Sequence, residues 1–340
     1  MKAGHSSGPA PADEMSAEEI RDTAFGFWRS RILLTAYELG VFTILEDGGK
    51  TSSEVARALG ADGRATDRLM NALCAIGLLE KGAGRFTNTA TGSRLLVRGS
   101  PEYMKGLMHS VHLWDTWTTL SQAVRQGTSV ASGPVNDRGD AWLTSFIEAM
   151  DERASRHAPV VAGMLDLSAV SRALDVGGGS GAYAMAFVRA RRGMRATVFD
   201  LPNVALLTRE HVQRQGLSET VEIVTGDYNT DDLGSGFDMA FLSAIIHSNS
   251  EEQNRCLLRK CSDALNRGGR VVVQDFIVDE DRTGPTFAAL FSLNMLVGTE
   301  SGDTFTENEV RSWMEAAGLS QCTRADTPFG TTLITGRKAS

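Results

Sequence analysis

The chain has 340 residues, 42% of them hydrophobic, with a formal net charge of −8 and a pI near 5.4. This length exceeds the usual domain of about 100–200 residues, so two domains are expected. The acidic balance argues against nucleic acid or an anionic membrane as the main partner, because both attract basic surfaces. A protein that acts on a small molecule is therefore the expected class.

Residues 1–15 are rich in Gly, Ser, Pro and Ala, which predicts a disordered tail. The tail has no apolar signal-peptide core, and no apolar run in the chain approaches the roughly 20 residues that span a bilayer. We therefore expect a cytoplasmic protein without a membrane partner. Four cysteines lack Cys-x-x-Cys spacing, which favours reduced thiols over a disulfide or a zinc site; they are Cys74, Cys256, Cys261 and Cys322.

Residues 16–100 are predicted to form a mostly helical domain. Apolar residues over Glu18–Leu45 recur every three or four positions, which predicts a helix with a wide apolar face that includes Trp28. A capping box at Thr51–Glu54 opens a short helix, a second helix follows the turn at 60–63, and 78–87 is predicted to be a β-hairpin. Helix, helix and hairpin in this order predict a winged helix.

A winged helix often binds DNA. Here Arg64 and Arg68 of the second helix stand beside Asp62 and Asp67, so there is no basic stripe for a phosphate backbone. A large apolar face normally marks an interface. We therefore expect this module to bind protein rather than nucleic acid.

Residues 101–165 are predicted to be helical and are rich in aromatic residues and methionine. Such residues at helical spacing commonly fill a core, and some of them are expected to line a ligand pocket. From residue 166 to 340 the pattern alternates between strands and helices. The strands are expected at 172–176, 196–200, 221–225, 237–243 and 270–277, followed by two β segments at about 321–326 and 331–337. Continuously apolar strands predict an α/β domain whose parallel sheet is covered on both faces.

A glycine-rich turn at Leu174–Gly181 follows the first of these strands. Glycines at 177, 179 and 181 allow a sharp turn and let a ligand approach the backbone closely. This pattern is typical of a nucleotide-type cofactor pocket, but it also satisfies the dinucleotide fingerprint. A plain βα turn and an NAD(P)-dependent oxidoreductase therefore stay open at this point, although the chain lacks a Tyr-x-x-x-Lys pair.

Acidic residues stand at the ends of three successive strands: Asp175, Asp200 and Asp227. The carboxyl ends of parallel strands form the edge where doubly wound folds bind ligands. A carboxylate at Asp200 is placed to accept hydrogen bonds from ribose hydroxyls.

Together these motifs resemble the S-adenosylmethionine-dependent small-molecule O-methyltransferases of the plant caffeate and bacterial polyketide type. The resemblance covers residues 17–337, and its motifs are 175–181, 199–204, 226–228, His247 before an acidic helix, and Gly268-Gly269 before a strand. It implies a Rossmann-like class I methyltransferase domain with a seven-stranded, mostly parallel sheet. It also implies an N-terminal winged-helix domain that forms a homodimer.

The resemblance also implies site residues. S-adenosylmethionine, with S-adenosylhomocysteine as product, would be bound by Asp175, Gly177, Gly179, Asp200, Leu201, Gly226, Asp227, Tyr228 and Ser243. Within this set the glycines would face the methionine moiety, Asp200 the ribose, and Asp227 and Tyr228 the adenine. An aromatic acceptor from secondary metabolism would be lined by His109, Phe146, Met150, Phe291, Asn294 and Met295.

His247 follows an apolar strand at the ligand edge, just before a helix that Ser250 and Gln253 are expected to cap. The resemblance makes it the general base for the acceptor hydroxyl, with Asp275 orienting its ring. No metal is expected, because the acidic residues do not form a helix-spaced ligand set.

The chain departs from the family pattern at several positions. The usual His-Asp-Trp is His247-Ser248-Asn249, and Asp275 replaces a glutamate. A second family carboxylate aligns with Thr304, although Glu300 and Asp303 are close in sequence. C- or N-methylation, a non-methylating enzyme that uses the same cofactor, and a winged-helix regulator that senses it remain alternatives.

Overall fold

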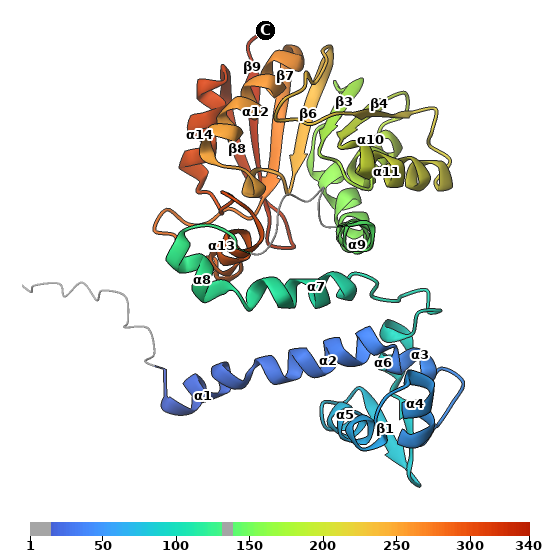
Figure 1. The fold of residues 1–340 in the computed structure, drawn as a ribbon. Helices are drawn as coiled ribbons and strands as arrows, with labels where there is room; N and C mark the ends of the chain where they lie inside the picture. The colour runs from blue at the N-terminus through green and yellow to red at the C-terminus, as the bar shows by residue number, and fades with distance from the viewer. Residues whose placement is uncertain (1–14, 131–138) are drawn as a thin grey trace, which may run out of the picture. The chain divides into compact units, whose positions relative to one another are not determined.

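The computed structural model describes residues 15–130 and 139–340, so the tail expected at 1–15 lies outside the described residues except for Met15. The chain divides into two compact units, residues 1–104 and 105–340, which are described separately (Figure 1). Most of the segment 101–165 belongs to the second unit. No helix in the described ranges has both the length and the apolar character to cross a membrane.

The N-terminal unit begins with three helices, α1 (Ala17–Phe25), α2 (Phe27–Leu39) and α3 (Val41–Ile44). The expectation of one continuous helix over 18–45 was therefore wrong. Gly40 adopts a left-handed conformation, φ 77°, which ends α2 as glycine commonly does. The described residues leave much of the apolar face exposed, because α1 buries no residue and Trp28 is 56% exposed.

The rest of this unit follows the expected order. The helices α4 (Ser52–Leu59) and α5 (Gly63–Ala75) precede an antiparallel hairpin of β1 (Leu79–Gly82) and β2 (Arg85–Asn88), and α6 (Ala90–Leu96) follows. The capping box is present, since the Thr51 hydroxyl accepts from the Glu54 amide and the Glu54 carboxylate accepts from the Thr51 amide. The sequence signals for helix, helix and hairpin are confirmed.

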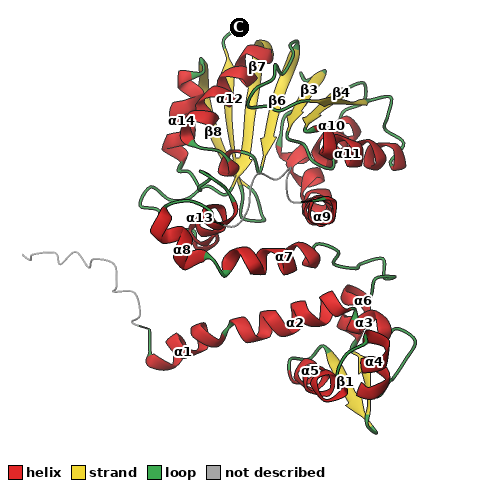
Figure 2. Ribbon diagram, viewed as in Figure 1, coloured by secondary structure: helices red, strands yellow, loops and turns green. Residues whose placement is uncertain are grey.

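The C-terminal unit is built on a seven-stranded sheet in the order β5-β4-β3-β6-β7-β9-β8 (Figures 1 and 2). The strands are β3 (Arg172–Val176), β4 (Arg195–Asp200), β5 (Val221–Thr225), β6 (Phe237–Ser243), β7 (Leu265–Asp275), β8 (Leu319–Asp326) and β9 (Thr332–Lys338). All neighbours pair in parallel except β7 with β9 and β8 with β9. The fold is the expected mostly parallel class I sheet.

Helices cover both faces of this sheet (Figure 2). On one face lie α12 (Glu251–Ala264) and α14 (Glu307–Ala316), and on the other lie α9 (Asp140–Met164), α10 (Ala182–Ala190) and α11 (Pro202–Arg214). This unit also contains α7 (Leu107–Trp117), α8 (Leu120–Gln126) and α13 (Thr286–Gly298), with the short 3-10 helix η2 (Ile246–Ser248). Leu174 and Val176 point into one core and Ala173 into the other, which is the alternation a strand imposes.

β7 differs most from its predicted bounds. β7 starts at Leu265 and ends at Asp275, so Gly268 and Gly269 lie within it rather than before it. Leu265 pairs with Phe237 while Arg270 pairs with Met239, which leaves the glycine pair in a bulge. Its end at Asp275 places that carboxylate at the edge of the sheet.

Candidate functional site

The strand order reverses between β3 and β6, which lie side by side in the sheet. In open α/β sheets, ligands bind at the carboxyl edge beside such a switch point. The glycine turn follows β3, and η2 with His247 follows β6 two residues after the strand ends. The fold therefore brings the glycine turn and His247, the two strongest functional signals in the sequence, to the same crevice at the sheet edge.

The glycine turn is closed on one side and open on the other. Gly177 and Gly179 have φ of 62° and 56°, which disfavours other residues. A Cβ on Gly177 would lie 2.3 Å from Ile245 Cδ1, whereas a Cβ on Gly179 would meet no atom within 4 Å. The backbone at Gly179 thus faces open space, as a turn that holds a ligand requires.

Asp175 lies beneath this turn and is almost fully buried. Its Oδ2 accepts a hydrogen bond from the Ala184 amide at 3.1 Å, while its Oδ1 has no partner among the described residues. Burial raises the pKa of this carboxyl to about 7. An orphaned buried acceptor usually indicates a missing ligand or water, so the site fits a ligand that carries hydrogen-bond donors.

Asp200 at the end of β4 is fixed by backbone groups. Its Oδ2 accepts from the Gly179 amide and its Oδ1 from the Leu201 amide, each at 2.8 Å. Burial raises the pKa of Asp200 to about 6. Each carboxylate oxygen still has a lone pair for a hydroxyl, so this side chain fits a ribose in a predefined orientation.

Tyr228 is held by a chain of side-chain amides. Its hydroxyl donates to Asn249 Oδ1 at 3.1 Å, Asn249 Nδ2 donates to Asn254 Oδ1 at 3.1 Å, and Asn254 Nδ2 donates to the Ile246 carbonyl at 2.8 Å. Burial raises the pKa of Tyr228 to about 12, so its hydroxyl stays protonated as a donor. Asn249, which replaces the family's aromatic residue, therefore fixes the position of an aromatic ring instead of supplying one.

Three further residues expected to bind the cofactor, Gly226, Asp227 and Ser243, differ in what they contact. A Cβ on Gly226 would lie 2.4 Å from the Phe199 ring, so only glycine fits. The Asp227 carboxylate accepts from the Asn229 amide at 2.8 Å. The Ser243 hydroxyl lies 3.4 Å from Gln274 Oε1, so it is already engaged by the neighbouring strand.

His247 is buried, and its Nδ1 lies 2.7 Å from Asp275 Oδ1. An ionised carboxylate only accepts, so Nδ1 carries the proton and Nε2 keeps a free lone pair. The same Asp275 oxygen accepts from the Phe276 amide at 2.8 Å, which fixes the carboxylate. His247 and Asp275, expected to act together, are in direct contact.

The backbone that leads to His247 is strained at one residue. Ala244, directly after β6, has φ 57°, which is uncommon for a residue other than glycine. The turn places Ile245 over Gly177 and starts η2. Strain of this kind concentrates at functional sites, where the surrounding structure holds it.

The acceptor residues expected from the sequence fall into two groups. Phe291 on α13 contacts the His247 ring with centroids 5.0 Å apart and belongs to a phenylalanine cluster of Phe276, Phe287 and Phe291. Asn294 lies one turn further along α13 and Met295 beside it is buried. His109 instead contacts Phe146, which packs near Leu201.

Met150 is half-buried on α9. Thr304, where the family has its second carboxylate, is 1% exposed. Asp303 pairs with Arg282 at 3.5 Å, and Glu300 is exposed, so neither carboxylate contacts His247.

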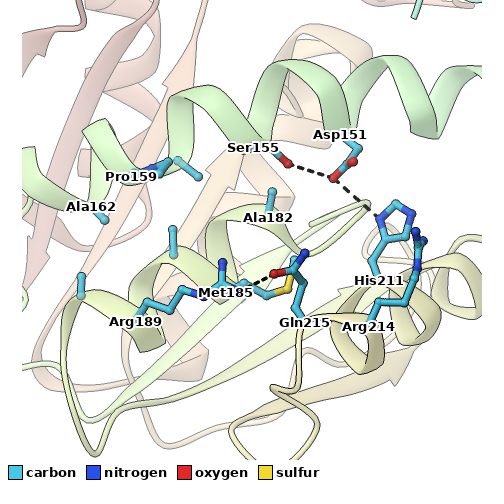
Figure 3. A pocket seen from close by; sticks show the side chains of 13 residues that line it. Asp151, Ser155, Pro159, Ala162, Ala182, Met185, Arg189, His211, Arg214 and Gln215 are labelled. Atoms are coloured by element: carbon cyan, nitrogen blue, oxygen red, sulfur yellow. Dashed lines mark hydrogen bonds and ion pairs between the residues drawn. The ribbon is translucent and has the colours of Figure 1, made fainter. Parts of the chain in front are cut away.

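A cavity of about 460 Å³ lies elsewhere, between α9, α10 and α11 (Figure 3). It has a floor of small apolar side chains, and at its rim Asp151 contacts His211 and Arg189 donates to Gln215. None of the expected site residues lines it. The described residues contain no group of three or more His, Cys, Asp or Glu that could hold a metal ion.

Sequence reasoning missed several residues of the site. Ile245 covers the glycine turn, Asn254 supports Asn249, and Trp117 donates to Asn294 at 2.9 Å. No local motif marks these residues, because each acts through contacts between segments distant in sequence.

Comparison with known proteins agrees with this geometry. Residues 117–320 match the model of an O-methyltransferase domain, and residues 21–98 match an O-methyltransferase dimerisation domain. The chain is 36% identical to a 3-hydroxy-5-methyl-1-naphthoate 3-O-methyltransferase of Streptomyces sahachiroi over 100% of both chains. It is 31% identical to the tetracenomycin polyketide synthesis 8-O-methyl transferase TcmO of Streptomyces glaucescens, over 94% of this chain and 96% of the relative.

Among solved structures, PigF with S-adenosylhomocysteine superposes with a TM-score of 0.88 at 27% identity, covering 95% of this chain and 100% of that one. That protein, from a Serratia species, is an S-adenosyl-L-methionine-dependent methyl transferase. The likeness covers both units of the fold.

Proposed function

Because this chain belongs to the family of S-adenosylmethionine-dependent O-methyltransferases, we propose that it methylates a hydroxyl of an aromatic small molecule of secondary metabolism, with His247 as general base. The family decides among the cofactors that the glycine turn left open, and a nicotinamide dinucleotide has no further support. The observation that carries the proposal is the 2.7 Å contact between His247 Nδ1 and Asp275.

This contact determines what His247 can do. Since Asp275 accepts a hydrogen bond from the Nδ1–H of His247, Nε2 is the atom that takes the proton from an acceptor hydroxyl. Asp275 then stabilises the imidazolium that forms. A general base of this kind contributes roughly 10²–10⁴-fold in rate, and positioning of the reactants contributes roughly 7–11 kcal/mol.

The cofactor would lie along the carboxyl edge of β3, β4 and β5. The backbone at Gly179 and the Asp175 carboxylate would hold its amino acid end, Asp200 its ribose hydroxyls, and Tyr228 its adenine. When bound, it supplies the methyl group from a sulfonium. The phenylalanine cluster would hold the aromatic acceptor beside His247.

The test is methyl transfer by the purified protein to a phenolic acceptor such as 2-naphthol, in a buffer that contains a chelator. Mass spectrometry should detect the methyl ether, because the proposed reaction needs no metal. Calorimetry on the same sample should show binding of S-adenosylmethionine and S-adenosylhomocysteine but not of nicotinamide dinucleotides. Cofactor binding without any O-methylated product from a panel of phenols would contradict the proposal.

We also propose that the N-terminal unit forms a homodimer. Its dimerisation domain carries large exposed apolar side chains on α1 and α2, namely Ile20, Phe25, Phe27 and Trp28. Burying such a patch removes apolar surface from water, which stabilises association. Light scattering at micromolar concentration should give a dimer mass, and Trp28→Glu should lower it. A monomer mass for the unaltered chain would contradict this assembly.

A further inference from the structure

The proposed base is held from three sides, and on one of them lies a loop that the proposed reaction does not use. Asp275 contacts the Nδ1 atom of His247 at 2.7 Å and its amide nitrogen at 3.4 Å. Phe291 of α13 contacts the imidazole ring. The loop 299–306, which connects α13 to α14, lies against the carbonyl of the same residue. The contact between this loop and the base therefore requires an explanation.

Gly302 is the residue of the loop that lies against the backbone of η2. A Cβ at this position would overlap the carbonyl oxygen of His247 and would lie 3.2 Å from the carbonyl carbon of Ser248. Gly302 does not have a positive φ, so its backbone conformation would accept other residues. Glycine is needed here because of space, since a side chain would push the loop and η2 apart.

The Thr299 hydroxyl links this contact to α13. It donates to the Met295 carbonyl at 2.7 Å, in the last turn of α13, and it accepts from the Gly302 amide at 2.9 Å. Phe291, one turn before Met295, contacts the His247 ring. The helix and the loop that follows it thus contact the base twice, at its ring through Phe291 and at its carbonyl through Gly302.

The loop is also attached to other segments on both sides of Gly302. The Thr128 hydroxyl donates to the Glu300 carbonyl at 2.8 Å. The Arg282 guanidinium donates to the Thr304 carbonyl at 2.9 Å. The backbone that supports η2 is therefore fixed by partners from outside the loop. Such support matters at a reacting centre, where a displacement of roughly 1 Å can cost about a hundredfold in rate.

We propose that Gly302 is a positioning residue for His247. Because Gly302 has no side chain, the loop can support the η2 backbone where the imidazole meets Asp275. The Thr299 hydroxyl keeps Gly302 in this place and links it to α13, so the base and the aromatic wall on that helix stay at a fixed distance. The inference rests on the proposed function and adds to it a residue that touches neither the cofactor nor the acceptor.

Gly302→Ala tests the proposal, with Gly298→Ala as its matched control. The first change adds a methyl group against the His247 carbonyl, and the second adds one four residues earlier, where it would meet no atom within 4 Å. In steady-state methyl transfer to 2-naphthol, Gly302→Ala should lower kcat at least about tenfold, because it displaces the base. Its affinity for S-adenosylhomocysteine, measured by calorimetry, should not change. Gly298→Ala should retain both the rate and the affinity.

The proton on His247 Nδ1 gives a readout that does not depend on turnover. Its hydrogen bond to the Asp275 carboxylate moves its NMR signal far downfield, where His247→Gln identifies it by its absence. Gly302→Ala should shift this signal or broaden it beyond detection, and Gly298→Ala should leave it in place. A merely structural role of Gly302 would lower the melting temperature without changing the signal.

Two substitutions at Thr299 test the link to α13. Thr299→Val removes the hydroxyl but keeps the shape of the side chain, so kcat should fall severalfold. Thr299→Ser keeps the hydroxyl and should retain most of the rate. This pair of variants also decides the question if Gly302→Ala does not fold.

The outcomes separate the inference from the proposed function. An Nδ1 proton signal that is the same in Gly302→Ala and in the unaltered chain would overturn the inference. A kcat of Gly302→Ala equal to that of Gly298→Ala would do so too, as would equal rates of Thr299→Val and Thr299→Ser. If the unaltered chain forms no methyl ether, the proposed function fails, but the Nδ1 proton signal still decides whether Gly302 positions His247.

Discussion

Two regions of the C-terminal unit are built in different ways: the proposed cofactor edge, at the carboxyl ends of β3, β4 and β5, and the proposed acceptor wall, formed by the phenylalanine cluster and Asn294. At the cofactor edge, backbone amides fix the functional groups, as when Gly179 and Leu201 donate to Asp200. At the acceptor wall, side chains from separate helices meet, as when Trp117 contacts Asn294. The first arrangement uses backbone groups of short motifs at the ends of neighbouring strands, while the second depends on how distant helices pack.

His247 stands where the two regions meet, and the largest expected effect concerns its partner. Asp275→Asn should lower kcat roughly 10²–10⁴-fold, the range expected for loss of the base itself, because an amide can donate to Nδ1 and so favour the tautomer whose Nε2 carries the proton. Cofactor affinity should change little. Asp275→Glu, which restores an acceptor, should recover part of the rate in steady-state kinetics.

A substitution in the glycine turn tests the rigidity of the cofactor edge. Gly177→Ala should weaken binding of S-adenosylhomocysteine at least about tenfold, because the new methyl group would collide with Ile245 and the backbone has φ 62°. Gly216→Ala is the control, since its φ is 67° but nothing lies within 4 Å. Similar losses of affinity in both variants would contradict the close fit at Gly177.

The buried carboxyls at the proposed cofactor edge make the stability of the folded chain depend on pH. The pKa of Asp175 is about 7 in the folded chain, above its ordinary value of 3.8, because burial disfavours the charge. Its contribution to stability is therefore full below pH 3.8 and is lost as the pH rises toward and through 7. Asp175→Asn should flatten the fall in melting temperature between these pH values, as measured by calorimetry. If the melting temperature of Asp175→Asn fell with pH as steeply as that of the unaltered chain, the upward shift of the Asp175 pKa would be contradicted.

The smallest expected effect concerns Tyr228. Tyr228→Phe removes the hydrogen bond to Asn249 but keeps the ring, so binding of S-adenosylhomocysteine should weaken only about two- to fivefold, the value of one neutral hydrogen bond. Asn249→Ala should do the same, and the double variant should be no worse than either single change. Additive losses would show that the two side chains act independently.

The difference between short local patterns and contacts of distant segments also explains which parts of the fold could be predicted from the sequence. The seven-stranded sheet, the helix caps at Thr51 and Ser250, and the turn at 174–181 depend on short patterns, and the structure contains each of them. The helix over 18–45 was predicted as one piece because hydrophobic periodicity does not reveal that Gly40 adopts a left-handed conformation. The start of β7 was missed because a bulge depends on the partner strand.

The candidate functional site likewise contains residues whose contacts were predicted correctly and residues whose contacts were not. The family resemblance implied that Asp275 orients His247, and the structure brings the two side chains together. The acceptor residues were expected as one pocket, but His109 and Phe146 pack near Leu201, while Phe291 packs against His247. Helical periodicity identifies which residues share a face, but not which other helix that face meets.

The central claim is that His247 removes the proton from the acceptor, and single-turnover methyl transfer tests it most directly. His247→Gln keeps a side chain of similar polarity but cannot act as a base at neutral pH. With both substrates saturating, this variant should transfer the methyl group at least about a hundredfold more slowly than the unaltered chain, while binding S-adenosylmethionine equally well. A single-turnover rate equal to that of the unaltered chain would exclude His247 as the base and contradict the account.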